Sequence, residues 1–243
     1  MGPSRRIRYE YEAPVCIWRI RITKTGITKY MSHLDFIRTV ERSARRAGLP
    51  LTLSGGFNPR PRMSFSPALP VGVSSHSEFV DLFLKESVDI DVASWKLNKS
   101  FPSGIRVIAS RILSPNVSAL SAVIEAASYR LALHAEVKID PGSIAKAVTE
   151  ILSEDSIEIV RTTPKGTRRI NLRPLIYDIR TEPENLPLSV YSVVASGSSG
   201  NVRILDLADI ILKFAGIRNN GVFMDITREG LYKFCNESLC LPW

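Results

Sequence analysis

Residues 32–48 form the most strongly marked helix of the chain, and this helix limits the folds that the sequence can adopt. Ser32 is expected to cap its N-terminus, with Asp35 three residues later in a variant of the capping box. Gly48 and then Pro50 end the helix, because glycine suits the left-handed C-terminal conformation and proline cannot continue a helix. A helix delimited in this way must bury one face against another element.

The two faces of this helix differ in chemistry. The predicted buried face, at about 100° per residue, consists of Leu34, Ile37, Val40, Ala44 and Ala47. Four arginines fall on the opposite side: Arg38, Arg42, Arg45 and Arg46. Arginine has a planar fork that binds phosphate. The alternative is a solvated face on which Glu41 pairs with Arg45.

Strand patterns surround the helix. Residues 15–25 alternate, with Trp18 and Ile20 on one side and Arg19 and Arg21 on the other, so we expect a half-buried strand with a basic outer face. Further strands are predicted at 49–54, 77–85 and 105–113, with a strand-like stretch at 62–72, and a second helix at 91–102. This order, β-α-β-β-α-β, is the ferredoxin-like arrangement.

The same order recurs in the second half of the chain, with one extra strand possible. We predict strands at 128–137, 156–162, 167–181, 188–198 and 222–234, and helices at 140–153 and 201–216. The fold class is therefore α+β, with tandem ferredoxin-like units and antiparallel sheets. The expected organisation is a disordered leader at 1–14, an N-terminal unit at 15–113, a connector at 114–127 and a C-terminal unit at 128–243.

The composition restricts the classes of function. The formal net charge of +8 favours a polyanionic partner, nucleic acid first, although charge also keeps a protein soluble. No apolar run approaches the roughly 18–20 residues of a membrane-spanning helix, and the charged start lacks the apolar region of a signal peptide. Cys16, Cys235 and Cys240 are too scattered for a disulfide framework, a zinc site or an iron–sulfur motif. We expect a cytoplasmic protein without a cofactor or metal of its own.

The stretch that follows the helix, "GGFNPRPRMSFSPALPVG" at 55–72, is stiff and basic. Pro59 and Pro61 fix the backbone, so that Arg60 and Arg62 are expected to project to a common side of an extended segment. Ordering arginines before binding lowers the entropy lost on binding. Together with Phe57 and Asn58 the stretch predicts a phosphate- or RNA-binding loop; the alternative is a rigid crossover packed against the helix.

Two weaker candidates remain. His33, in the first helical turn, and nearby Tyr30 are candidate acid/base residues, but a histidine at a cap more often forms a local hydrogen bond. A second basic cluster is expected at a hairpin and the strand after it: Lys165, Arg168, Arg169 and Arg173. Its alternative interpretation is an exposed charged hairpin.

The string "SHLDFIRTVERSARRAGLPLTLSGGFNPRPRMSFSPALPVGVSS" resembles a bacterial family of radical-SAM-linked proteins, a domain of unknown function found beside or fused to radical-SAM cobalamin-type proteins. The resemblance covers at least residues 16–110 and continues more weakly through "RINLRPLI" and "ITREGLY". Arg60 stands where many relatives have histidine, and Asn171 where aspartate is common, which argues against a strictly catalytic role for both. The duplicated layout also resembles that of the CRISPR-associated endoribonucleases that process repeat RNA.

Three hypotheses follow. The first is an RNA-binding accessory module that presents tRNA or rRNA to a radical-SAM enzyme, which would carry the cluster. The second is a metal-independent endoribonuclease that uses His33 and Tyr30. The third is a protein-interaction scaffold whose loop docks on the radical-SAM partner. No motif assigns an activity to the chain on its own, and the sequence leaves its oligomeric state open.

Overall fold

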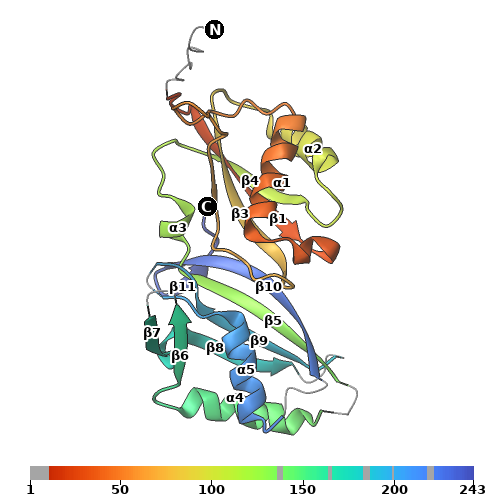
Figure 1. The fold of residues 1–243 in the computed structure, drawn as a ribbon, viewed down its shortest axis with the longest axis vertical. Helices are drawn as coiled ribbons and strands as arrows, with labels where there is room; N and C mark the ends of the chain where they lie inside the picture. The colour runs from red at the N-terminus through yellow and green to blue at the C-terminus, as the bar shows by residue number, and fades with distance from the viewer. Residues whose placement is uncertain (1–10, 136–138, 164–165, 183–186, 199, 218–221) are drawn as a thin grey trace, which may run out of the picture. The chain divides into compact units, whose positions relative to one another are not determined.

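The computed structural model describes residues 11–135, 139–163, 166–182, 187–198, 200–217 and 222–243 (Figure 1). The chain divides into two compact units, residues 1–122 with Trp243, and residues 123–242. Each unit combines helices with an antiparallel sheet, so the predicted α+β class is confirmed. Within the described ranges no helix is long and apolar enough to cross a membrane.

The first unit has the predicted order of elements. They are β1 (Cys16–Lys24), the 3₁₀ helix η1 (Gly26–Tyr30), α1 (His33–Arg46), β2 (Met63–Phe65), β3 (Ser74–Leu84), α2 (Ile90–Ser100) and β4 (Val107–Leu113). The strand order is β4-β1-β3-β2, and every neighbouring pair is antiparallel. Both helices belong to this unit, and α1 and α2 lie side by side in Figure 1.

The strand predicted at 49–54 does not form. Only the isolated bridges of Leu51 with Leu84 and of Leu53 with Pro61 occur there. The strand-like stretch at 62–72 forms a strand only in β2. Proline has no N–H group to donate to a strand ladder, and the prolines on both sides of this segment keep the pairing short. The result is an irregular, closed loop instead of a wide hairpin.

Helix α1 is capped as predicted, and Val40, Ala44 and Ala47 of its predicted inner face are buried. The Ser32 side chain accepts a hydrogen bond from the Asp35 N–H group. Phe36 is buried and packs edge-on against Phe65, whereas Leu34 is 63% exposed. The predicted inward position of Leu34 is therefore wrong. Phe36 is buried on this helix instead.

Strand β1 is covered on both faces, so the predicted basic outer face is also wrong. Arg19 is only 2% exposed and forms a two-pronged ion pair with Asp81, with nitrogen–oxygen distances of 2.7 and 2.8 Å. One Arg19 nitrogen also approaches the Ser118 carbonyl at 3.5 Å. The Trp243 ring packs against Phe79 of the neighbouring strand β3, with ring centroids 5.2 Å apart. These segments exclude water from the side of the sheet that alternation assigned to solvent.

The second unit contains a sheet and a separate hairpin. Its elements are α3 (Leu120–Val123, at the boundary), β5 (Ala126–Ala135), α4 (Pro141–Ser153), β6 (Glu158–Thr163), β7 (Gly166–Asn171), the 3₁₀ helix η2 (Arg173–Leu175), β8 (Ile176–Glu182), β9 (Ser189–Ala195), α5 (Ile204–Phe214), β10 (Val222–Cys235) and β11 (Ser238–Cys240). The sheet order is β10-β5-β9-β8, with β11 paired to β10. Strands β6 and β7 pair only with each other among the described residues.

The single strand predicted at 167–181 is wrong, because the chain turns in its middle. The Asn171 side-chain oxygen accepts hydrogen bonds from the N–H groups of Ile157 and Arg173, at 2.9 and 3.0 Å. Pro174 then follows in η2 without an N–H group to continue a ladder. Asn171 thus ends the hairpin and redirects the chain into the main sheet.

We expect Asp81→Ala to lower the free energy of unfolding by about 3–5 kcal/mol, because Arg19 would keep a buried charge without its partner. Urea denaturation of the full chain measures this loss. Glu86→Ala is the control, since this exposed carboxylate of the same unit forms no side-chain ion pair within the described ranges. Equal stability losses in the two variants would contradict the role given to the buried pair.

Candidate functional site

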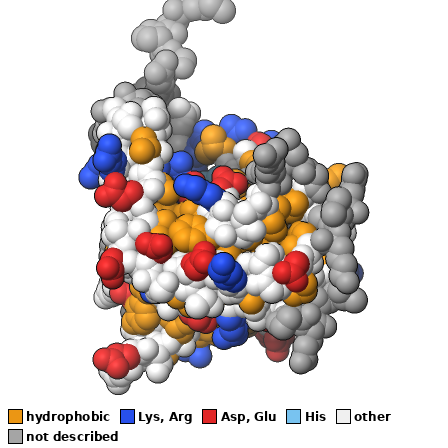
Figure 2. Space-filling model, turned by 90° about the horizontal axis from the view of Figure 1, so that it is seen from below, with side chains coloured by type: hydrophobic (Ala, Val, Ile, Leu, Met, Phe, Trp, Pro, Cys, Tyr) orange, Lys and Arg blue, Asp and Glu red, His pale blue; other side chains and the backbone are white. Residues whose placement is uncertain are grey.

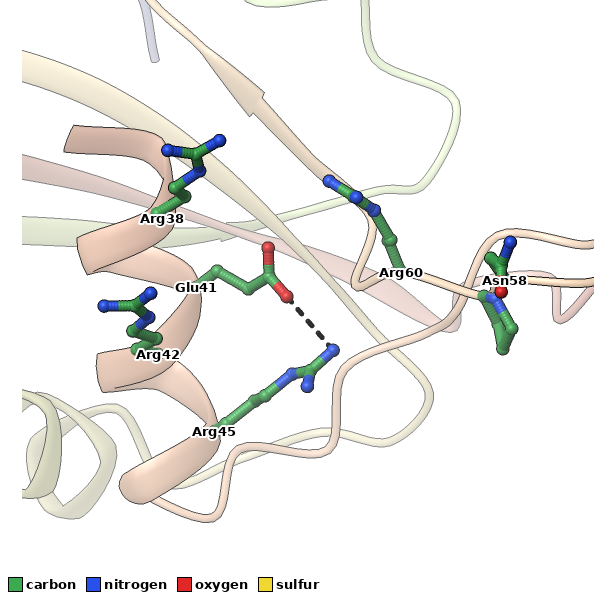
Figure 3. A pocket seen from close by; sticks show the side chains of 7 residues that line it. Arg38, Glu41, Arg42, Arg45, Asn58 and Arg60 are labelled. Carbon is green, nitrogen blue, oxygen red and sulfur yellow. Dashed lines mark ion pairs between the residues drawn. The ribbon is translucent and has the colours of Figure 1, made fainter. Parts of the chain in front are cut away.

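A basic hollow of about 470 Å³ lies between α1 and the loop at 54–60. Its lining residues are Arg38, Glu41, Arg42, Arg45, Asn58, Pro59 and Arg60. Figure 3 shows the side chains of α1 on one side of the hollow and those of Asn58 and Arg60 across from them. Four arginines against one glutamate give the lining a net charge of three positive units. The structure thus brings together two sets of residues that the sequence suggested separately.

The helical side of the hollow is only partly neutralised. Glu41 pairs with Arg45 at 3.0 Å, and Asp35 pairs with Arg38 at 3.3 Å. Exposed ion pairs of this kind are weak and are screened by salt. Arg42 has no ion pair or side-chain hydrogen bond among the described residues, although it is exposed between its basic neighbours. An anion that entered here would therefore find a guanidinium group without an acidic partner.

The loop side is held in place by main-chain hydrogen bonds. The Ser54 N–H group donates to the Arg60 carbonyl at 2.8 Å, and the Arg60 N–H group donates to the Ser54 hydroxyl at 3.0 Å. Gly56 has a φ of +110°, which glycine adopts without the steric cost of a side chain. These contacts close the loop at its base and fix the backbone from which Arg60 projects.

The loop is also attached to strand β3. The Phe83 carbonyl accepts a hydrogen bond from the Thr52 N–H group at 2.8 Å, and the Phe83 N–H group donates to the Arg62 carbonyl at 3.3 Å. The Arg62 N–H group donates to the Thr52 carbonyl at 2.9 Å. Both limbs of the loop are therefore tied to one residue of the sheet.

Arg60 and Arg62 have different surroundings, although they lie two residues apart. The Arg60 side chain lines the hollow and has no partner among the described residues. The Arg62 guanidinium stacks on the rings of Phe83 and Tyr11, at 4.5 and 4.8 Å from their centroids, and donates to the Tyr11 hydroxyl at 2.6 Å. Arg62 does not line the hollow, so the structure does not bring the two arginines together there. Phe57, at the loop tip, is 58% exposed.

The remaining candidates of the first unit lie outside the hollow. Arg46 donates to the Ser100 carbonyl at 2.7 Å, which joins the C-terminal ends of α1 and α2. His33 packs edge-on against Phe65 at 6.2 Å, and Tyr30 is exposed with the Lys29 ammonium over its ring. None of these residues lines the hollow.

The second predicted basic cluster is divided by the fold. Arg168 and Arg169 are exposed on β7, and Arg169 lies 3.8 Å from Glu158. Arg173 instead donates to the carbonyls of Leu152 and Ile176, at 2.9 and 3.0 Å, and so binds the end of α4 to the turn. Lys165 lies outside the described residues. Arg173 therefore has a structural environment, whereas Arg168 and Arg169 face solvent.

Sequence reasoning did not assign Glu41 and Pro59 to the site. Glu41 was expected only as a pair for Arg45, and it does form that pair while lining the hollow. Pro59 was expected to stiffen the loop, and its ring forms part of the wall. In the described part of the chain no group of three or more His, Cys, Asp and Glu side chains is arranged to hold a metal ion. The site is suited to binding an anion through guanidinium groups.

The two units and the hollow define an α+β protein with a basic hollow in its first unit. The model of one protein family, described as an uncharacterized protein conserved in bacteria (DUF2344), matches residues 18–204, and the chain belongs to this family. No curated protein matches the chain. It is similar to a chain in the solved structure "Crystal Structure of a Cbf5-Nop10-Gar1 Complex", with a TM-score of 0.43 and 12% identity, over 90% of this chain and 53% of that one. The present chain thus spans about half the length of that chain.

We expect Ser54→Ala to loosen the loop, because the Arg60 N–H group loses its acceptor. Hydrogen exchange of the Arg60 amide should become faster while the amides of α1 keep their protection. Ser121→Ala is the control, since this exposed serine forms no side-chain hydrogen bond within the described ranges. Unchanged exchange at Arg60 would show that the hydroxyl does not hold the loop.

Proposed function

We propose that the chain is an RNA-binding module whose phosphate-binding site is the basic hollow. The observation that carries this proposal is the convergence of Arg38, Arg42 and Arg45 with Arg60 around one hollow. A guanidinium group donates two parallel hydrogen bonds to a phosphate, and arginine is more weakly hydrated than lysine. A row of arginines against a rigid loop suits a chain of phosphates.

The geometry supports a nucleic acid over a single small anion. Arg38, Arg42 and Arg45 lie on successive turns of α1, so their charges extend along the helix. Phe57 is exposed on the same loop as Arg60, in a position to stack on a base. The net charge of +8 would also attract a polyanion from a distance.

The endoribonuclease hypothesis gains no support from this geometry. His33 and Tyr30 do not line the hollow, so neither acid/base candidate stands next to the arginines that would bind the phosphate. A phosphate bound in the hollow would therefore have neither His33 nor Tyr30 beside it. Binding without cleavage is the function that we propose.

The partner of this module is proposed from the sequence resemblance alone. That resemblance implies a radical-SAM enzyme that carries the cluster and acts on the bound RNA, with tRNA or rRNA as the substrate, in the cytoplasm. The ferredoxin-like assignment of both units is likewise our proposal. It is supported by the strand orders β4-β1-β3-β2 and β10-β5-β9-β8, each of which is antiparallel throughout.

We expect Arg42→Ala/Arg60→Ala to weaken RNA binding and its dependence on salt. Each lost phosphate contact should reduce the salt slope by about 0.7 for a single strand. Fluorescence anisotropy of a labelled 12-nucleotide single-stranded RNA, measured across a salt series, gives both the affinity and the slope.

The matched control is Lys96→Ala/Arg106→Ala, which also removes two exposed positive charges from the first unit but none from the hollow. If the hollow binds phosphate, the control keeps most of the affinity and slope. If both double variants lose the same amount, binding depends on net charge and the hollow is not the site.

A further inference from the structure

A second hollow lies in the other unit, between an edge strand and a helix. It has a volume of about 350 Å³. It is lined by β6 with the residue before it, residues 157–162, and by one side of α5. Three basic and three acidic side chains line it, so the lining has no net charge. This property separates it from the basic hollow and disfavours a nucleic acid as its occupant.

One main-chain edge of β6 is unpaired in the described part of the chain. The Leu172 N–H group donates to the Ile157 carbonyl at 2.8 Å, and the Ile157 N–H group donates to the Asn171 side chain at 2.9 Å, so Ile157 faces β7. The β6–β7 register has no shift, and hydrogen-bonded pairs alternate in an antiparallel ladder. Glu158, Val160 and Thr162 therefore point their N–H and C=O groups away from β7.

This edge lacks two of the devices that can protect a strand edge. It has no proline and no bulge, and Val160 is 64% exposed. An unprotected edge of this kind is a template on which another extended segment can pair. In this chain the edge is regular enough to pair with a second strand over its whole length.

Helix α5 contributes apolar side chains to the lining of the groove and is held next to β6. Ile210 and Phe214 lie four residues apart on α5 and line the hollow together with Ile159. Arg161 is held against α5 by Asp206 at 2.7 Å and by the Asn201 carbonyl at 3.3 Å. The strand edge and the helix are therefore fixed to each other across the opening.

We propose that this groove binds an extended peptide of a partner protein, which adds as a strand to the free edge of β6 beneath α5. Main-chain pairing would give the affinity, and alternate side chains of the peptide would meet Ile210 and Phe214. The face drawn in Figure 2 has apolar side chains open to solvent among acidic and basic ones, the mixed character that the lining residues of this groove also have. A peptide with alternating apolar residues and little net charge fits the lining of the groove. The proposal is independent of RNA binding.

The test uses the outward N–H group of Val160. Val160→Pro removes this donor but leaves the bonds to β7, since proline is tolerated at a strand edge whose N–H group points outward. Val160→Thr is the matched control, because it keeps the donor and the branched shape. Hydrogen exchange of Ile159 and Arg161, which face β7, confirms that the hairpin stays folded in both variants.

The probe is a phage-displayed library of random dodecapeptides selected on the full chain, followed by synthetic copies of the enriched peptides. We expect these peptides to alternate apolar and polar residues. Their affinity should fall about tenfold or more on Val160→Pro, the equivalent of about 1.4 kcal/mol, and should change little on Val160→Thr.

Three results would overturn the proposal. The first is the absence of enriched peptides, or enriched peptides that bind the proline variant equally well. The second is a dimer in analytical ultracentrifugation that only Val160→Pro dissociates, since a second copy would then occupy the edge. The third is loss of affinity for the 12-nucleotide RNA in Val160→Pro alone, which would assign the groove to nucleic acid.

Discussion

The hydrogen bonds at Phe83 hold the basic hollow together. The Phe83 carbonyl accepts a hydrogen bond from Thr52, and the Phe83 N–H group donates one to Arg62. Thr52 and Arg62, on the two limbs of the loop, also form a hydrogen bond with each other. These hydrogen bonds hold the loop, which is rich in proline and glycine, near α1. The sheet thereby fixes the distance between Arg60 and the arginines of the helix. Preorganisation of this kind lowers the entropy cost of binding, which is otherwise large for long, flexible arginine side chains.

The arginines of α1 are difficult to explain by stability alone. Arg38 and Arg42 are like charges four residues apart, an arrangement that costs a helix about 0.2–0.5 kcal/mol. Arg45 relieves part of the repulsion through Glu41, but Arg42 has no acidic partner in the described ranges. Alanine at this position would form helix at least as well. The charge of Arg42 does not stabilise the helix, whereas it would contribute to a surface that binds anions.

The sequence predicted the parts of this site that depend on local rules. Ser32 and the arginine face of the helix follow from capping and from the helical period, both of which act within a few residues. The contacts that failed depend on the rest of the chain. Arg19 was placed in solvent because alternation cannot show that later segments cover the second face of a strand. The turn at Asn171 was missed because its hydrogen bond with Ile157 joins residues 14 positions apart in the chain.

Arg62 illustrates the same limit inside the loop. Its spacing from Arg60 predicted a shared direction, but its guanidinium group lies against two aromatic rings instead. Arg62 stacks on Tyr11 and Phe83 and donates to the Tyr11 hydroxyl, and it does not line the hollow. Sequence spacing assigns directions along an extended backbone, whereas the choice between a ligand and an internal aromatic partner depends on residues distant in the chain. Arg60 has no such partner in the described ranges and lines the hollow, so two arginines of one short motif have different surroundings.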